Sequence, residues 1–224
     1  MPLYLGNSTG IKNLFYANKR IVQAYYGTTL VYNTYRTGTV VFESGNPGQY
    51  PIKLLTQGVY ELMICGAGGG GGGSATSHSW MGQTGGSGAA FKGNVILPNY
   101  PITIDIGTGG TGGTPSGSNA NGGGNGTATN IYYTDGSFTL IQAKGGNGGN
   151  GTGGSYNNGA GGTLDITGLT SKSWIVSSEI STNGVANSNV SILGNGYGAG
   201  GVAQYHSSGT AGTSGYVKIT FLYV

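Results

Sequence analysis

Short apolar runs rich in Val, Ile, Tyr and Phe recur along the chain and are separated by turn-forming residues. They predict strands because these residue types favour extended backbone, and because no stretch repeats its apolar positions with the 3.6-residue period of a helix. The predicted strands are 39–43, 50–55, 58–65, 89–97, 102–106, 131–133, 138–143, 174–176, 190–193 and 216–223. We therefore expect an all-β fold whose strands form a β-sandwich-like domain.

The first 37 residues differ from the rest because they contain little glycine and echo themselves after ten positions. In both units, 13–22 and 23–32, aromatic residues precede a short turn and β-branched residues follow it. This is the pattern of a β-hairpin. Because hairpins alone are marginally stable in water, we expect 1–37 to form a small β-hairpin attachment module. Residues 38–224 are then the glycine-rich β domain.

Glycine changes this picture, since it fills 50 of the 224 positions while charged residues make up only 7%. Its main runs lie between predicted strands, at 66–73, 107–113, 122–126, 145–154 and 194–201. Two of them, 107–114 and 145–154, repeat every three residues, which is the period of a polyproline-II-type helix. Two interpretations follow: flexible linkers, or polyglycine-II helices that pack side by side through backbone hydrogen bonds. Loop-length statistics favour packed helices.

Candidate catalytic groups are few and scattered. Only His78 and His206 could act as imidazole bases, and both are far in sequence from any of the six acidic residues. The run 66–71 formally matches a dinucleotide-binding pattern, but no helix is predicted after it. Nine Lys and Arg form no dense patch, so a nucleic-acid partner is not expected. We expect a non-enzymatic protein without a metal site or cofactor, in which the single Cys65 is a buried structural thiol.

Targeting signals add one expectation. The N-terminal segment lacks a charged region followed by a long apolar stretch, and no run of about 18 apolar residues occurs. We therefore expect neither secretion by the standard route nor a membrane-spanning helix.

Bulky residues interrupt the glycine runs in a few places. If the runs are rigid spacers, these interruptions form loops at one end of the domain. The residues that they would present as a receptor-binding surface are His78, Trp80, Met81, Tyr156, Tyr197, Tyr205 and His206. Aromatic groups beside Ser, Asn and Gln suit sugar rings as well as protein hot spots. The alternative is that Trp80 and Tyr205 fold back to cover an edge.

Strands alternating with Gly-Gly-x runs that are broken by short aromatic loops resemble the glycine-rich adhesins at the tips of bacteriophage long tail fibres. In that family, packed polyglycine-II helices carry the receptor-determining loops. Residues 39–71 with 215–221 are similar to the glycine-rich domain common in phage tail and fibre proteins. Residues 4–7 and 25–32 resemble short N-terminal modules of phage structural proteins, which are not part of the tip-adhesin pattern.

The resemblance implies a virion protein on the phage surface or tail that attaches to a host bacterium. Its partners would be a bacterial surface polysaccharide or outer-surface protein and, through residues 1–37, other virion proteins. The resemblance also implies a homotrimer, since phage fibres are commonly trimeric. Two other functions stay open: a purely structural virion component, such as a capsid decoration or tail-assembly protein, and an ice-binding or matrix protein that uses the flat face of packed glycine helices.

Overall fold

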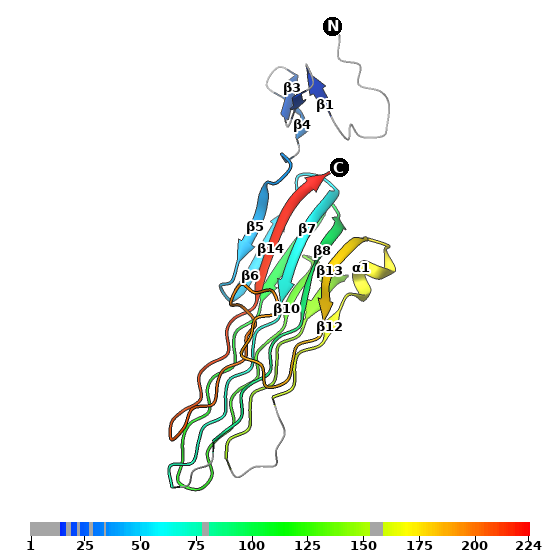
Figure 1. The fold of residues 1–224 in the computed structure, drawn as a ribbon. Helices are drawn as coiled ribbons and strands as arrows, with labels where there is room; N and C mark the ends of the chain where they lie inside the picture. The colour runs from blue at the N-terminus through cyan, green and yellow to red at the C-terminus, as the bar shows by residue number, and fades with distance from the viewer. Residues whose placement is uncertain are drawn as a thin grey trace.

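The computed structural model describes residues 14–16, 19–21, 23–26, 29–33, 35–77, 81–152 and 159–224. A strand-rich body lies in the middle of an elongated molecule, and long glycine-rich segments extend from one of its ends (Figure 1). The described strands and helix are β1 (Leu14–Tyr16), β2 (Lys19–Ile21), β3 (Gln23–Tyr26), β4 (Thr29–Asn33), β5 (Val40–Ser44), β6 (Gly48–Lys53), β7 (Gly58–Cys65), β8 (Ala90–Leu97), β9 (Pro101–Ile106), β10 (Thr129–Tyr133), β11 (Thr139–Ala143), β12 (Leu164–Asp165), α1 (Thr167–Ser171), β13 (Ile175–Thr182) and β14 (Tyr216–Tyr223).

The body is a sandwich of two five-stranded antiparallel sheets. One sheet has the order β12-β11-β10-β9-β6 and the other β13-β8-β7-β14-β5. The predicted all-β, sandwich-like fold is confirmed. Neither β12 nor the five-residue α1 was predicted, because both are too short to leave a periodic pattern. No described helix has the length and apolar character that crossing a membrane would require.

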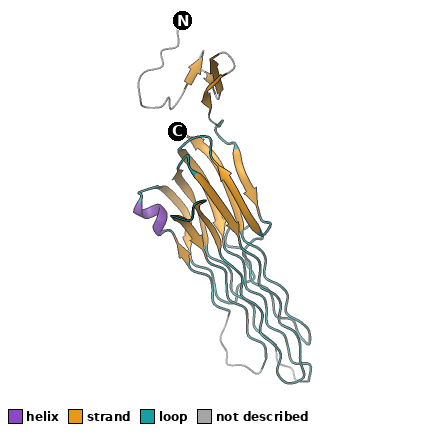
Figure 2. Cartoon of the chain, turned by 180° about the vertical axis from the view of Figure 1, so that it is seen from behind, coloured by secondary structure: helices purple, strands orange, loops and turns teal. Residues whose placement is uncertain are grey.

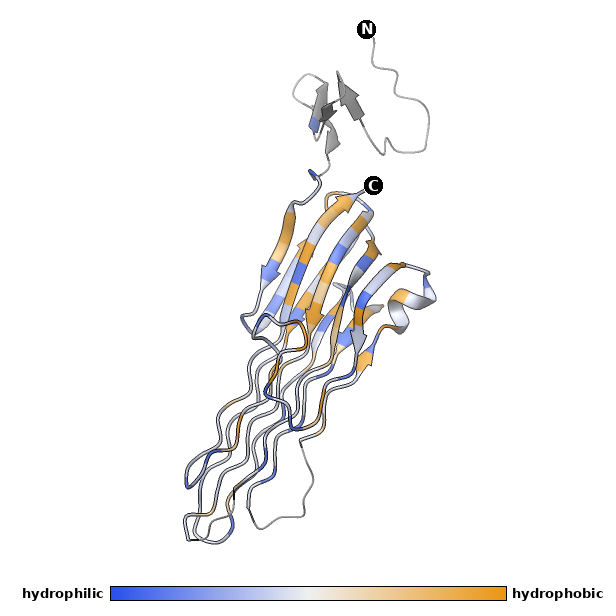
Figure 3. Cartoon of the chain, viewed as in Figure 1, coloured by the Kyte–Doolittle hydropathy of each residue, from blue (hydrophilic) through white to orange (hydrophobic). Residues whose placement is uncertain are grey.

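Alternation along the strands builds the core of the sandwich. Tyr60, Leu62 and Ile64 of β7 are fully buried, whereas Glu61 and Met63 between them are half-buried. Burial of each large side chain stabilises the fold by about 1.5–3 kcal/mol. The Tyr60 hydroxyl donates to the Thr56 carbonyl at 2.7 Å, so its polar end does not oppose this burial. Apolar residues accordingly concentrate in the strands, while the glycine segments are pale (Figure 3).

The N-terminal strands form the two predicted hairpins: β1 pairs with β2, and β3 with β4, both antiparallel. The chain then joins the sandwich at the end away from the glycine segments. There, Gly38 N–H donates to the Phe221 carbonyl at 2.8 Å, and the Thr37 hydroxyl donates to the Leu222 carbonyl at 2.8 Å. The Tyr35 ring packs against Tyr60 and Phe221.

A glycine bundle continues the strands beyond the sandwich, and residues 66–74 form its central helix. Successive N–H groups of this helix point in three directions in rotation, to segments 83–89, 121–127 and 207–213, with N···O distances of 2.8–3.2 Å. A rotation repeated every three residues defines a threefold helix of the polyglycine-II type. The bundle is drawn without strand arrows in Figure 2, since its bonds do not form a flat ladder.

Three further segments, 107–114, 144–152 and 198–203, donate N–H groups to carbonyls of the central helix. Six segments therefore surround it, and neighbours in this ring also bond to one another; for example, Gly124 donates to the Thr111 carbonyl at 2.8 Å. Every residue from 66 to 75 is buried. The packed-helix interpretation of the glycine runs is confirmed for these segments.

Close approach, rather than unusual dihedral angles, explains the glycines of the central helix. A Cβ atom at Gly68, Gly69 or Gly70 would overlap a backbone carbonyl, each from a different neighbouring segment. At the outside of the ring, where a neighbouring helix is missing, side chains accept the free N–H groups. Thr213 Oγ1 accepts from Ala199 N–H at 2.8 Å in this way.

Two predictions for the region before residue 200 are wrong. No strand forms at 190–193, and the glycine run 194–201 is a packed helix only after residue 198. The reason is local, since Gly194, Gly196 and Gly198 all have positive φ and turn the chain sharply. Ile192 and Leu193 instead pack on a small cluster around Cys65 on the outer face of the β7 sheet.

Candidate functional site

The far end of the glycine bundle, here called the tip, consists of loops that join its helices. The described tip residues are 75–77, 81, 115–119 and 204–208. Strand β7 runs toward the tip, whereas the C-terminus lies at the opposite end (Figure 1). Tyr35 packs against Phe221, near the C-terminal end of β14. Of the predicted receptor-binding residues, His78, Trp80 and Tyr156 lie outside the described residues.

Two tip loops are bonded to each other directly. Ala75 and Ser116 form a parallel β-bridge, and Thr76 N–H donates to the Ser116 carbonyl at 3.0 Å. Ser77 donates to the Gly117 carbonyl twice, from its N–H at 3.2 Å and from its hydroxyl at 2.6 Å. The described start of the first loop, 75–77, is thus braced by residues 116 and 117, which the sequence pattern did not single out. The sequence feature that could have indicated this contact is the group of turn-forming residues at 115–119, which follows the period-three run 107–114.

A third loop is held by the buried Ser74 at the end of the central helix. Ser74 N–H donates to the Ser207 carbonyl at 3.1 Å, and its hydroxyl donates to the Gln204 carbonyl. The same hydroxyl accepts from Gly82 N–H at 3.2 Å. Because hydrogen bonds of buried groups are costly to break, Ser74 ties three segments of the tip together.

Tyr205, His206 and Met81 are brought to the tip as predicted. Tyr205 is 51% exposed and Met81 is 52% exposed, so Tyr205 does not fold back to cover an edge. The His206 ring meets Tyr205 edge-on at 4.0 Å between centroids, and its Nδ1 lies 3.1 Å from the Ala75 carbonyl oxygen. His206 has a φ of 51°, a conformation that is uncommon for a residue with a side chain.

The prediction that Tyr197 belongs to this surface is wrong. Tyr197 stacks on Tyr216 of β14 at 4.8 Å between ring centroids, where the sandwich meets the bundle. It closes the cluster that contains Cys65, and burial raises the pKa of the Cys65 thiol to about 12. Sequence could not separate Tyr197 from Tyr205, since both follow glycine-rich stretches.

Lys, Arg, Asp and Glu are absent from the described part of the tip, which presents hydroxyl, amide, imidazole and aromatic groups. The two ion pairs of the described residues, Lys92–Glu179 and Lys218–Glu43, lie on the sandwich. Hydrogen bonds from Tyr216 and Lys218 lower the pKa of Glu43. Among described residues, no group of three or more His, Cys, Asp or Glu could hold a metal ion.

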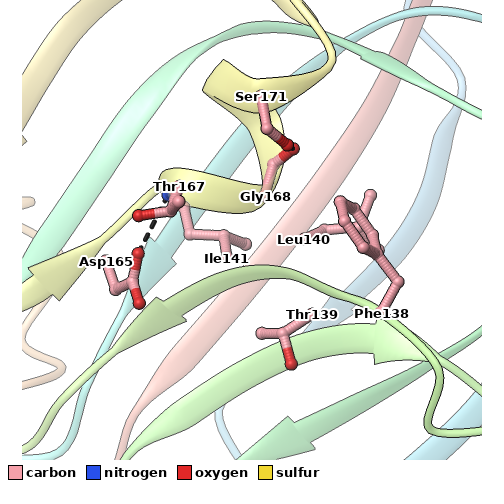
Figure 4. A pocket seen from close by; sticks show the side chains of 8 residues that line it. All are labelled: Phe138, Thr139, Leu140, Ile141, Asp165, Thr167, Gly168 and Ser171. Carbon is pink, nitrogen blue, oxygen red and sulfur yellow. Dashed lines mark hydrogen bonds between the residues drawn. The ribbon is translucent and has the colours of Figure 1, made fainter.

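The sandwich also has a hollow beside α1. Its volume is 190 Å³, and residues of β11 and α1 form its walls (Figure 4). Thr167 donates hydrogen bonds to the Asp165 carboxylate at its rim, from N–H at 2.9 Å and from the hydroxyl, and these bonds lower the pKa of Asp165. A more open depression of 350 Å³ lies by Leu164 and Thr182.

Comparison with known proteins places most of the chain in one family. Residues 45–222 match the family described as the glycine-rich domain. Since the match covers well over half of the 224 residues, the chain belongs to the glycine-rich domain family. No curated protein matches the chain significantly.

Proposed function

We propose that this chain is a bacteriophage tail-fibre adhesin that attaches the virion to a host bacterium through its tip loops. It acts by binding rather than catalysis. The observation that carries the proposal is the separation of two ends: residues 35–39 enter the sandwich at one end, and the braced loops with exposed Met81 and Tyr205 lie at the other. An attachment protein needs this arrangement, because one end joins the particle while the other meets the cell.

The glycine bundle supports this function through rigidity. The described parts of the tip loops lie next to helices that are hydrogen-bonded to several neighbours, so these parts have little conformational entropy to lose on binding. Aromatic and hydroxyl groups without charge suit a surface polysaccharide or a polar patch of an outer-surface protein. Several copies on one particle would raise a weak single-site affinity by multivalency.

The test is binding of the fluorescently labelled full chain to a panel of candidate host bacteria, with and without excess cell-surface polysaccharide. We expect saturable, strain-specific binding that polysaccharide competes away. Tyr205→Ala should abolish binding without changing the thermal midpoint, as should Trp80→Ala, the sequence-predicted neighbour. Tyr100→Ala is the matched control, because Tyr100 is 44% exposed but lies on the sandwich.

Absence of binding across a panel that contains the host would reject the adhesin. The alternative is a structural virion component in which the bundle is a spacer and residues 1–37 hold it in place. Binding that both tip variants retain would reject the tip as the site.

A further inference from the structure

The hollow beside α1 has a specific origin in the sheet. Strand β12 pairs with only two residues of β11, Gln142 and Ala143. The chain then leaves this sheet and crosses to the other sheet through α1, which packs against the edge of β11 that β12 does not cover. The Thr139–Ile141 edge of β11 therefore has no strand partner on this side among the described residues. Gly168 of α1 packs against the Thr139 and Leu140 carbonyls instead, and the 190 Å³ hollow lies beside this contact.

One side of the hollow is apolar. Phe138 is partly buried between Tyr133, at 5.5 Å between ring centroids, and Lys172, whose Nζ lies 5.5 Å from the ring centroid. Leu140 is fully buried beneath it. Phe138 therefore forms the accessible apolar wall of the hollow, and the buried Leu140 lies close to it in the chain (Figure 4).

The other side is polar. The Asp165 carboxylate is held in place by hydrogen bonds that it accepts from Thr167, and while ionised it can accept further hydrogen bonds but cannot donate one. The Ser171 hydroxyl donates to the Gly168 carbonyl at 3.0 Å and keeps its lone pairs as acceptors. The Thr139 hydroxyl makes no hydrogen bond within the described residues and can both donate and accept. Donors and acceptors thus face the apolar wall across a small space.

Charge and size restrict what can bind here. Asp165 disfavours an anion, whereas Lys144, which interacts electrostatically with Asp165, and Lys172 disfavour a cation. The volume of 190 Å³ is below the ~300 Å³ of pockets for drug-sized ligands. A small neutral molecule with one apolar face and several hydroxyl groups meets all of these conditions.

We propose that this hollow is a second binding site that takes one neutral sugar residue, free or within a polysaccharide. The ring lies against the exposed part of Phe138, and its hydroxyls bond to Asp165 and Thr139. The site is built from residues of the sandwich and does not depend on the tip loops. It can therefore be tested independently of the adhesin proposal.

The test is saturation-transfer NMR of the full chain with glucose, galactose, mannose and N-acetylglucosamine. We expect saturable transfer to at least one of them. Asp165→Asn keeps the oxygen that accepts from Thr167 but loses the charge, so affinity should fall about tenfold. Ser171→Leu should fill the hollow and remove binding. Thr170→Leu on the same helix does not line the hollow and should leave binding unchanged.

Two outcomes would overturn the site: no transfer to any of the four sugars, or transfer that Ser171→Leu leaves intact. Thermal unfolding of each variant shows whether it has folded. Tyr205→Ala separates the two proposals, because it should remove cell binding and leave the sugar signal of the hollow unchanged.

Discussion

Gly70 faces the backbone carbonyl of Thr111 so closely that a Cβ atom at position 70 would overlap its oxygen. The contact joins the central helix to one of its six neighbours. Equivalent contacts from Gly68 and Gly69 join it to two others. The glycines therefore set the spacing of the bundle, since hydrogen bonds of 2.8–3.2 Å between helices require backbones without side chains between them.

Gly70→Ala should destabilise the protein by about 3 kcal/mol or more, because the neighbouring backbone is fixed by its own hydrogen bonds and cannot move aside. Urea unfolding measures this change. Gly117→Ala is the control, since a Cβ there meets nothing within 4 Å. It should stabilise the fold by about 0.4–1 kcal/mol by restricting the unfolded chain. Equal effects of the two substitutions would contradict the close-packing explanation.

Thr213→Val should cost about 1 kcal/mol, because valine has the shape of threonine but cannot accept the Ala199 N–H. Thr108→Val is the matched control. Thr108 is also exposed on a bundle helix, but its hydroxyl makes no hydrogen bond within the described residues. Urea midpoints of the two variants give the comparison. If the Thr213 variant is as stable as the Thr108 variant, water replaces the hydrogen bond from Ala199 N–H without loss of stability.

Glu43 should make stability depend on pH in the acid range. Hydrogen bonds from Tyr216, at 2.6 Å, and from Lys218 lower its native pKa below the ordinary 4.5. The stabilisation is therefore complete above pH 4.5 and is lost as the pH falls through the lowered native pKa. Glu43→Gln should be less stable than the wild type at pH 7, and this difference should shrink in acid. Parallel pH profiles of unfolding free energy would argue against the assignment.

Cys65 should be unreactive in the native protein. Burial raises the pKa of its thiol to about 12, so at pH 8 almost none of it is the nucleophilic thiolate. A disulfide reagent that reports thiols by absorbance should label the protein rapidly in guanidinium and very slowly without it. Tyr197→Ala removes the ring stacked on Tyr216 and should speed native labelling. Rapid labelling of the native wild type would mean that this cluster opens readily.

Much of the sandwich was predictable because its strands alternate strongly. The predicted strands 58–65 and 216–223 agree with β7 and β14 at both ends. The predicted strand 174–176 marked only the start of β13, because most of the following residues in this edge strand are exposed and polar. The bundle was only partly predicted. Segments 82–89, 159–163 and 209–215 are packed helices but contain fewer consecutive glycines than the runs selected.

The tip was also predicted only in part. Met81, Tyr205 and His206 could be selected as bulky residues between glycine runs, but Tyr197 met the same criterion and lies at the sandwich. Ser74, which braces the loops, carries no distinctive sequence signal, and the turn-forming stretch around Ser116 does not reveal which loop Ser116 bonds to. Their role arises from bonds between residues 40 or more positions apart.

The sequence by itself determined that the chain is all-β and that its glycine runs with period three can form threefold helices, because both properties depend on local backbone preference. Which segments pack together, where each glycine is obligatory, which loops meet at the tip and where the β11 edge stays open were decided only by the tertiary structure. The physical reason is that interhelical hydrogen bonds link distant segments, and their partners depend on the order in which the sheets place the strands.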